Sequence, residues 1–441
     1  MEPCLAARRG RELLWWAVCC FLRLQGPALA AESEKVYVED VRFAVEQIEQ
    51  QCGGLIEQKK IDWKQVADSF LKEARTVKTD PEHLVLLTRL LARLRDGHAR
   101  VVPLEKGEEV KWPDDGRDRF TGPGMFWCRI KGKYYVKNSF GSAAASGVVA
   151  GSEILKVDGT PAVKWVEQRA AEVRDLESFS TEQQELFFVL GRGLAAAPGT
   201  RMELEVKEPD GKPKKRTVTY TKDSTRSRGP AVFPENLEVC GSLGHGRLAS
   251  GFGYIHLSRC PEDLPLQMDA SLQALQNVPG LILDFRGNGG GGFDHDALMG
   301  RFIPEGKKLS FAKSYESAGE HPYAGPVVVI VDATVISAAE TASGMFKEDG
   351  RGYMIGESAT AGMSSQKTTI ELPSRLFGLY VSTGSNKGRF NGGRGIEGIG
   401  VAPHELLEYN PGDLSRGVDT LIARAQRLLA DFPADKVPYH R

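Results

Sequence analysis

Two segments of this chain constrain its fold more than any other feature: LILDFRGNGGGG at residues 281–292 and VVVIVDATVISAAE at residues 327–340. Each begins as a continuous apolar run, which is typical of a strand buried on both faces. Where each strand would end, small residues follow. The first break is a glycine-rich loop, and the second places Ser337 at the expected start of a helix. Neighbouring strand ends of this kind can supply a nucleophile and the backbone donors that stabilise an oxyanion.

The composition is that of an ordinary globular protein with more than one domain. The chain has 441 residues, of which 41% are hydrophobic and 26% charged, so it can form two or three domains with a sizeable core. Its formal net charge is −1. Because there is no basic excess, we expect neither a nucleic-acid partner nor attachment to an anionic membrane surface.

The first thirty residues have the layout of a signal peptide. Arg8, Arg9 and Arg11 precede an apolar stretch at 13–22, and Ala28-Leu29-Ala30 offers small residues for cleavage. This pattern predicts a signal peptide at residues 1–30 and an exported protein of the periplasm, cell envelope or extracellular space. The alternative is an N-terminal anchor, but the apolar run is short of the ~20 residues that a spanning helix needs. We therefore expect no stable membrane span after cleavage.

Four cysteines remain beyond this segment: Cys52, Cys128, Cys240 and Cys260. They are widely spaced and form no CxxC pattern, so we expect no metal site. An oxidising compartment would permit disulfides in any of three pairings, and buried free thiols are the alternative.

The pattern of apolar and polar residues divides the rest of the chain into three regions. Together these regions predict a multidomain α+β protein. Residues 31–117 show helical periodicity, residues 118–223 are rich in β patterns with a helical insert at 163–195, and residues 236–430 alternate strands with helices. The last pattern is typical of an α/β core, with helices expected at 337–346 and 414–429. A charged stretch at 221–228 is the expected linker.

Motifs in these regions resemble, in order, those of the tail-specific (C-terminal-processing) serine peptidase family, which includes the tricorn-like peptidases. The matching elements are Asp96-Gly97-His98, the β-rich middle region, the strand and loop at 281–290, Ile336-Ser337-Ala338-Ala339-Glu340, and the late segment 395–403. The resemblance spans nearly the whole chain beyond residue 30. It implies a PDZ-like domain at 118–223, a crotonase-like (ClpP-like) catalytic core, a polypeptide substrate and no cofactor.

Ser337 is the candidate nucleophile. It follows a buried strand at a helix start, where the helix dipole favours developing negative charge. A simple N-cap role is the alternative. The resemblance implies that Ser337 attacks the substrate and that the backbone N–H groups of Gly290 and Ala338 form the oxyanion hole. Residues 287–292 could otherwise cradle a phosphate, but no Gly-Lys-Ser/Thr sequence follows them.

The general base has two candidates. Some members of the family carry a lysine where this chain has Met363, which cannot accept a proton, and Lys367 is a displaced alternative. The tricorn-like members use a histidine and a glutamate, which correspond here to His98 and Glu397. Histidine, with an ordinary pKa of ~6.5, suits proton transfer near neutrality, and a carboxylate would orient its ring. The serine that precedes the histidine in that pattern is replaced here by Gly97.

In the middle region, the resemblance implies that a loop of Gly122, Gly124, Met125 and Phe126 captures the substrate's chain terminus. We therefore expect an exported serine endopeptidase that acts on unfolded or C-terminal segments of polypeptides. A catalytically inactive binding protein on the same scaffold is the alternative, and a nucleotide-binding α/β protein is a third interpretation. No pattern predicts the oligomeric state.

Overall fold

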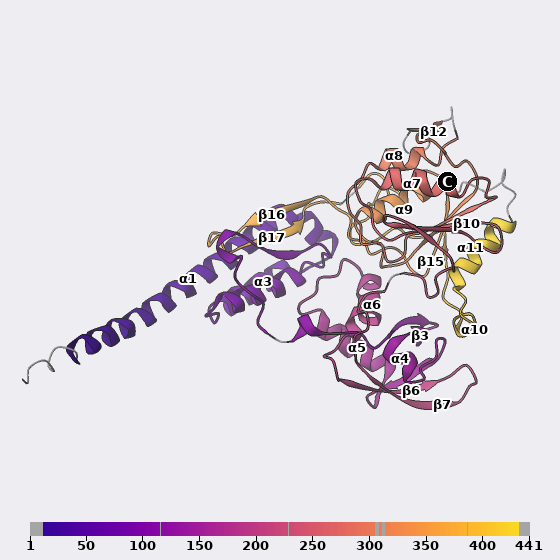
Figure 1. Cartoon of the computed structure of the whole chain (residues 1–441). Coiled ribbons are helices and arrows are strands. Elements are labelled where there is room, and N and C mark those ends of the chain that lie inside the picture. The colour runs from indigo at the N-terminus through magenta and orange to yellow at the C-terminus, as the bar shows by residue number, and fades with distance from the viewer. Residues whose placement is uncertain are drawn as a thin grey trace, which may run out of the picture. The chain divides into compact units, whose positions relative to one another are not determined.

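The computed structural model describes residues 12–431 except 115, 228, 305–307, 311–313 and 386 (Figure 1), and for 12–34, 308–310 and 314 it describes the backbone alone. Residues 1–11 of the expected signal peptide lie outside the described residues, and from Glu12 the backbone is part of helix α1 (Glu12–Gln58). No helix within the described ranges is both long and apolar enough to cross a membrane. The chain divides into two compact units.

The smaller unit comprises residues up to 94, 99–113 and 368–381. Helices α1, α2 (Trp63–Ala74) and α3 (Asp80–Ala92) share one hydrophobic core with a three-stranded sheet of order β1-β17-β16. Its strands are β1 (Arg100–Pro103), β16 (Lys367–Glu371) and β17 (Phe377–Ser382), with the short helix η1 (Glu105–Gly107) after β1. Helix α3 begins at a capping box in which Thr79 and Glu82 bind each other's backbone N–H groups. The range predicted for the core, 236–430, thus includes residues of the smaller unit, because β17 pairs with β1.

The larger unit contains a seven-stranded sheet that carries the two apolar runs. Its order is β18-β15-β14-β11-β10-β9-β8, and the runs form β11 (Leu281–Asp284) and β14 (Val327–Val331), which pair in parallel. The other strands are β8 (Glu238–Cys240), β9 (Leu243–Arg247), β10 (Gly253–Leu257), β15 (Tyr353–Gly356) and β18 (Glu405–Leu406). Leu281 and Leu283 face one hydrophobic cluster, whereas Ile282 faces the other. The predicted burial on both faces is confirmed.

Helices cover both faces of this sheet (Figure 1). Helices α7 (Leu264–Ala274), α8 (His295–Gly300) and α9 (Ala338–Glu348) pack in one cluster, and α11 (Thr420–Asp431) packs in the other, next to the short helix α10 (Pro411–Ser415). A two-stranded hairpin of β12 (Lys308–Ser310) and β13 (Ser314–Glu316) follows α8. The single helix expected at 414–429 is wrong: Gly417, with φ 70°, separates two helices.

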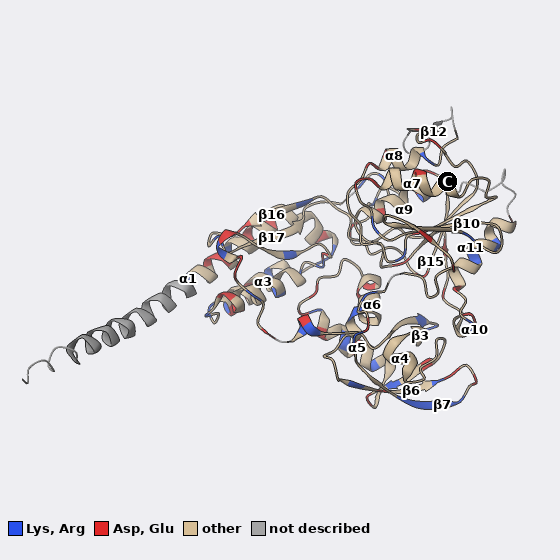
Figure 2. Ribbon diagram, viewed as in Figure 1, with Lys and Arg blue, Asp and Glu red and all other residues tan. Residues whose placement is uncertain are grey.

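The β-rich region forms a six-stranded antiparallel sheet of order β2-β3-β4-β6-β7, with β5 paired to β4. Its strands are β2 (Met125–Ile130), β3 (Lys133–Ser139), β4 (Glu153–Val157), β5 (Thr160–Pro161), β6 (Arg201–Lys207) and β7 (Pro213–Thr219). Its helices are η2 (Arg117–Arg119), α4 (Gly141–Ala145), α5 (Ala162–Val173), α6 (Glu182–Leu190) and η3 (Arg192–Leu194). The insert expected at 163–195 is therefore two helices and a 3₁₀ turn. Basic residues gather on β7 (Figure 2), where Lys214 and Arg216 pair with Glu208.

The four cysteines beyond the expected signal peptide form no disulfide with one another. Cys52, Cys128 and Cys260 are buried, and Cys240 is partly exposed. None of the three disulfide pairings that the sequence left open among these four residues is present. Burial raises the pKa of the Cys260 thiol to about 12, although its contact with Asn288 lowers it somewhat. This thiol therefore stays protonated at neutral pH.

Candidate active site

Ser337 lies at a sharp turn between strand β14 and helix α9. Asp332 follows the strand, and its carboxylate accepts hydrogen bonds from the backbone N–H and the hydroxyl of Thr334. Ser337 has φ 57° and ψ −126°, a conformation that side-chain-bearing residues rarely adopt. Its backbone N–H donates to the carboxylate of Glu340, 3.1 Å away. This strained strand-to-helix turn has the form of a nucleophile elbow, and Ser337 also stands at the N-cap position of α9.

The glycine-rich loop after β11 lies against this turn. A Cβ atom on Gly290 would stand 2.8 Å from Ser337 Cβ and 3.2 Å from the Ala338 backbone nitrogen, so only glycine fits there. The backbone N–H of Ile336 donates to the Asn288 carbonyl at 3.1 Å. The predicted oxyanion residues therefore lie beside Ser337. In this structure, however, the Gly290 N–H donates to the side chain of Asn288 at 2.9 Å.

His98 is within hydrogen-bond reach of the candidate nucleophile. Its Nε2 lies 3.2 Å from Ser337 Oγ. The backbone N–H of His98 donates to Asp96 at 2.9 Å, and the Asp96 carboxylate also accepts from the backbone N–H and the hydroxyl of Ser382. These bonds fix the turn that carries the imidazole.

Glu397 joins His98 at the same place. Asp96, His98 and Glu397 each contribute one N or O atom to a cluster in which these atoms lie within 4.8 Å of one another. Asp96 and Glu397 are buried, whereas His98 is half-buried. The three also have the donor types of a cation site. Because one of them contacts Ser337, the cluster can equally hold and move a proton.

Ser180 is a member of this group that the sequence reasoning missed. Its hydroxyl donates to Glu397 Oε1 at 2.9 Å and accepts the backbone N–H of Gly97, also at 2.9 Å. Ser180 is 3% exposed and precedes helix α6. It thereby supplies a hydroxyl beside Gly97, where the tricorn-like pattern has a serine. The hydroxyl residues Ser180 and Thr181 signal a helix start, and indeed Thr181 caps α6, but that signal does not indicate a partner 217 residues away.

Glu340 ties the nucleophile turn to a second loop. Its buried carboxylate accepts hydrogen bonds from the hydroxyl of Thr360 and from the backbone N–H groups of Gly362 and Met363 at 2.6–2.9 Å, besides the bond from Ser337. Burial raises the pKa of Glu340 to about 7, and the bonds from the Thr360–Met363 loop limit this rise. The loop that carries a lysine in part of the family is therefore held directly against the elbow.

Met363 occupies the lysine position inside the site. Its sulfur accepts a hydrogen bond from Gln184 at 3.0 Å and would lie 2.9 Å from a Cβ on Gly97. The displaced candidate, Lys367, is exposed at the start of β16, where its amine donates to the Ser365 carbonyl at 2.8 Å. The His98 imidazole is a basic group in contact with the Ser337 hydroxyl.

Two of the four predicted capture residues lie in the six-stranded sheet, and Gly122 and Gly124 precede its first strand. Met125 and Phe126 are buried in strand β2 and do not form a loop. The backbone N–H of Gly122 donates to the Asp223 carbonyl, and that of Phe126 donates to the Asn138 side chain. Gly124 has φ 78°, and a Cβ there would lie 2.3 Å from the Phe140 carbonyl oxygen. A substitution at Gly124 would therefore disturb the sheet itself and cannot isolate substrate capture.

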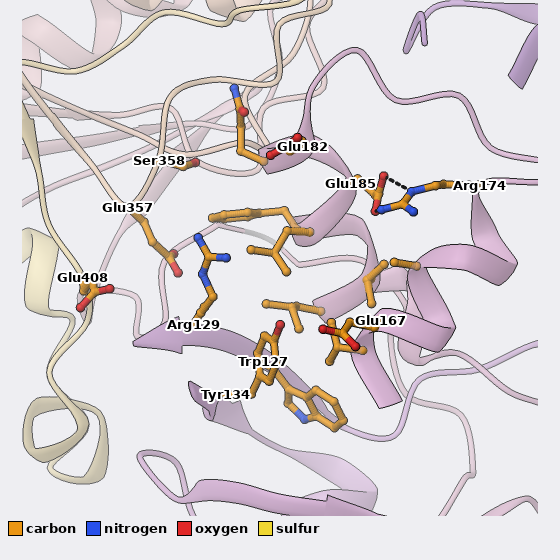
Figure 3. Close-up of a pocket in the computed structure, with 17 residues that line it drawn as sticks. Trp127, Arg129, Tyr134, Glu167, Arg174, Glu182, Glu185, Glu357, Ser358 and Glu408 are labelled. Carbon is orange, nitrogen blue, oxygen red and sulfur yellow. Dashed lines mark hydrogen bonds and ion pairs between the residues drawn. The ribbon is translucent and has the colours of Figure 1, made fainter. Parts of the chain in front are cut away.

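A cavity of about 510 Å³ lies next to strand β2 (Figure 3). Trp127 and Arg129 of β2 line it together with apolar residues of α5 and α6, among them Val166 and Leu186. Glu357, which follows strand β15 of the core, also lines it. The cavity thus combines an apolar helix-and-strand groove with charged groups, which suits a polypeptide segment.

Comparison with known proteins places these features in a family context. Residues 251–407 match the model of peptidase family S41. The carboxyl-terminal-processing protease of Picosynechococcus sp. is 25% identical over 365 residues, which cover 79% of this chain and 78% of that protease. The chloroplastic C-terminal processing peptidase of Tetradesmus obliquus is 27% identical over 62% of this chain and 56% of its own length. The crystal structure of mature CPAF has a similar mixed α/β fold, with a TM-score of 0.65, 16% identity, and coverage of 90% of this chain and 97% of that one.

Proposed function

We propose that this chain, which belongs to peptidase family S41 and is a serine-type peptidase, uses Ser337 as nucleophile and His98 as general base, with Glu397 orienting His98. The observation that carries the proposal is the 3.2 Å separation of His98 Nε2 and Ser337 Oγ. It joins a strained elbow serine to a histidine that lies in one cluster with the carboxylates of Asp96 and Glu397, and a serine, a histidine and a carboxylate are the parts of the serine triad. No step requires a lysine.

In this mechanism His98 takes the proton from Ser337 as Oγ attacks the scissile carbonyl carbon. The charge on the resulting oxyanion is stabilised by the Ala338 N–H at the start of α9 and by the N–H of Gly290, which would turn from Asn288 toward the substrate. His98 then gives the proton to the leaving amine, and an acyl-enzyme forms. A water molecule, deprotonated by His98 in its turn, hydrolyses this ester and releases Ser337.

For the substrate, we assign the six-stranded sheet to the PDZ-like type and the seven-stranded core to the crotonase-like type. Strand β2 is an edge strand of its sheet, so an extended peptide can pair with it, and the cavity beside it has room for side chains. The similar proteins from Picosynechococcus and Tetradesmus are named as carboxyl-terminal and C-terminal processing enzymes. These features support a peptidase that acts on unfolded or C-terminal segments.

Labelling by a fluorophosphonate probe tests the proposal, because such probes react with activated serines. We expect the purified chain to label and Ser337→Ala to remain unlabelled. His98→Ala should also abolish most peptide hydrolysis, and the Ser337→Ala/His98→Ala double variant should be hardly worse than either single variant, because the two groups act as a unit. Lys367→Met should retain nearly all activity.

Two outcomes would contradict this assignment. Near-normal turnover by His98→Ala together with collapse of Lys367→Met would identify the displaced lysine as the base. A chain that neither labels nor hydrolyses any peptide, yet binds peptides, would be an inactive binding protein on this scaffold.

A further inference from the structure

A second cavity, of about 690 Å³, opens beside strand β8 at the edge of the core sheet. One wall is apolar and is formed by Phe233, Leu237 and Val239. Val239 is 79% exposed, which is unusual for an apolar side chain on a strand of a folded domain. An exposed apolar wall next to a concave surface favours a binding site over simple packing.

The charged side chains that line this cavity are both arginines. Arg226 and Arg259 are exposed, and no Asp or Glu is among the lining residues. Within the part of the chain that the structure describes, neither guanidinium forms a salt bridge, whereas most other arginines of the core do, such as Arg286 and Arg301. The cavity is therefore positive and its cations are available to a ligand.

The same cavity adjoins the loop that flanks Ser337. Gly287 lines it and precedes Gly290 by three residues, a stretch that spans at most about 10 Å. Arg259 is followed by Cys260, whose backbone N–H donates to the Gly290 carbonyl at 3.0 Å. Gly290 in turn lies against Ser337. The edge of the cavity at Gly287 is therefore within reach of a substrate residue a few positions from the scissile bond.

We propose that this cavity is a specificity subsite for an acidic side chain of the polypeptide substrate, within about three residues of the scissile bond. A guanidinium matches a carboxylate through paired N–H donors, and Arg226 and Arg259 can share one carboxylate between them. The apolar wall at Val239 suits the methylene groups of a glutamate. The inference rests on the proposed function, since it assumes that a peptide is cleaved at Ser337.

Internally quenched peptides that differ only in Glu, Gln or Lys at one position test this subsite. The position is scanned over three residues on each side of the cleaved bond. We expect one position at which kcat/KM for Glu exceeds that for Gln by about tenfold, as a pair of charge-assisted contacts would give. Arg226→Gln and Arg259→Gln should each reduce this ratio, mainly through KM, and the double variant should remove it. Arg259→Glu should shift the preference toward Lys.

Arg247→Gln is the matched control. Arg247 is an exposed arginine on β9 outside the cavity, where it donates to the Gln276 carbonyl at 3.0 Å, so its replacement should leave the Glu to Gln ratio unchanged. Equal cleavage of the Glu and Gln peptides at every position by the unaltered chain would overturn the proposal. A preference that survives in the double variant would overturn it too.

Two further measurements distinguish binding of an acidic side chain from binding of the terminal carboxylate, and separate this proposal from the proposed catalytic mechanism. Peptides with a free or an amidated C-terminus show whether the arginines instead bind the terminal carboxylate, and a preference for the free acid alone would overturn the side-chain assignment. Binding of the same peptides to Ser337→Ala, measured by fluorescence anisotropy, does not depend on hydrolysis. The Glu preference must appear there even if His98 is not the base, so failure of the proposed mechanism leaves this test intact.

Discussion

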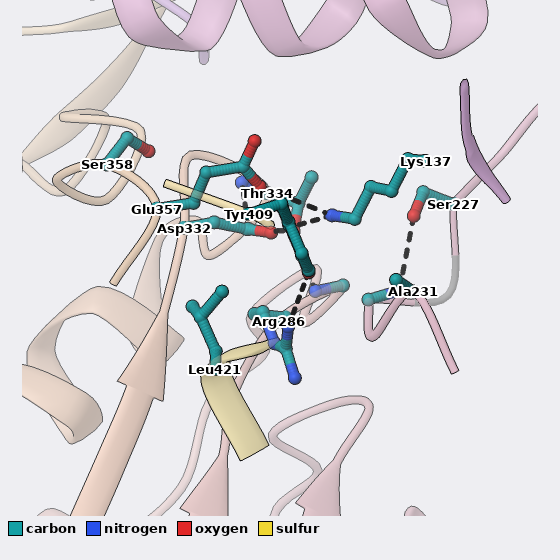
Figure 4. A network of polar contacts seen from close by, with 12 residues as sticks. Lys137, Ser227, Ala231, Arg286, Asp332, Thr334, Glu357, Ser358, Tyr409 and Leu421 are labelled. Carbon is teal, nitrogen blue, oxygen red and sulfur yellow. Dashed lines mark hydrogen bonds and ion pairs between the residues drawn. The ribbon is translucent and has the colours of Figure 1, made fainter. Parts of the chain in front are cut away.

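Lys137 of strand β3 connects the six-stranded sheet to the core through a buried ionic network (Figure 4). Its amine lies 3.4 Å from a carboxylate oxygen of Glu357 and 3.9 Å from one of Asp332, and the side chains of all three are at most 7% exposed. The amine also lies 4.8 Å from the ring centroid of Tyr409. Lys137→Met keeps most of the side-chain volume but removes the cation.

The expected cost is the penalty for leaving two buried carboxylates without their amine. Removing one partner of a buried pair typically costs about 3–5 kcal/mol, and we expect Lys137→Met to lower the free energy of unfolding by this amount at pH 7.5. Burial raises the pKa of Glu357, and Lys137 is the largest cause that lowers it. When folding raises the pKa of a carboxyl group, the protein loses stability as the pH rises from the unfolded-state pKa to the folded-state pKa of that group. Because the variant raises this pKa further, its deficit should shrink as the pH falls and Glu357 takes up a proton.

Urea unfolding followed by tryptophan fluorescence at pH 5 and pH 7.5 measures the effect. Lys133→Met is the control on the same strand: Lys133 pairs with Glu153 at 2.8 Å, but its side chain is 60% exposed, so its loss should cost less than about 1 kcal/mol. The Lys137→Met/Glu357→Gln double variant should recover much of the deficit, since it removes a buried charge as well. A loss in Lys137→Met no greater than that in Lys133→Met, or a deficit that grows at pH 5, would refute the reasoning.

Three other predictions follow from the site and the chain's start. Ser180→Ala should reduce kcat/KM by about tenfold, the equivalent of one weakened hydrogen bond to a charged group, and should also lower the unfolding midpoint because the Gly97 N–H loses its acceptor; an unchanged rate would show that Glu397 does not need this bond. Because burial raises the pKa of Glu340 to about 7, its contribution to stability should fall as the pH rises from about 4.5 toward 7, and this slope should be absent in Glu340→Gln. N-terminal sequencing of protein recovered outside the cytosol should begin near Ala31, and an intact Met1 there would contradict export.

The elements that the sequence predicted well are those with local signals. The runs at 281–283 and 327–331 could be recognised as neighbouring buried strands because every residue in them is apolar, and burial on both faces favours that pattern. The helix expected at 414–429 was wrong because apolar periodicity continues past Gly417, where the backbone turns.

Prediction of the candidate site residues depended mainly on the family resemblance, more than on local sequence patterns. The approach of His98 to Ser337 was predicted by resemblance and not by periodicity, since the two residues are 239 positions apart. Ser180 could not be found in either way, because the residues that the resemblance singled out in the middle region lie at 122–126, and a serine before a helix is an ordinary cap. The predicted capture residues Met125 and Phe126 became part of a strand because each is apolar and extended backbone continues through them to Ile130.

The wide spacing of the residues around Ser337 has a consequence for when the chain can be active. The contact between Ser180 and Glu397 joins segments 217 residues apart, and such contacts form late because closing a long loop costs chain entropy before it is rewarded. During synthesis Ser337 is made before Glu397, so the proposed relay is incomplete on every nascent chain that ends before residue 397. Under the proposed mechanism, hydrolysis becomes possible only after the last of these segments has folded into place, so a chain that ends before residue 397 cannot cleave the machinery that synthesises it.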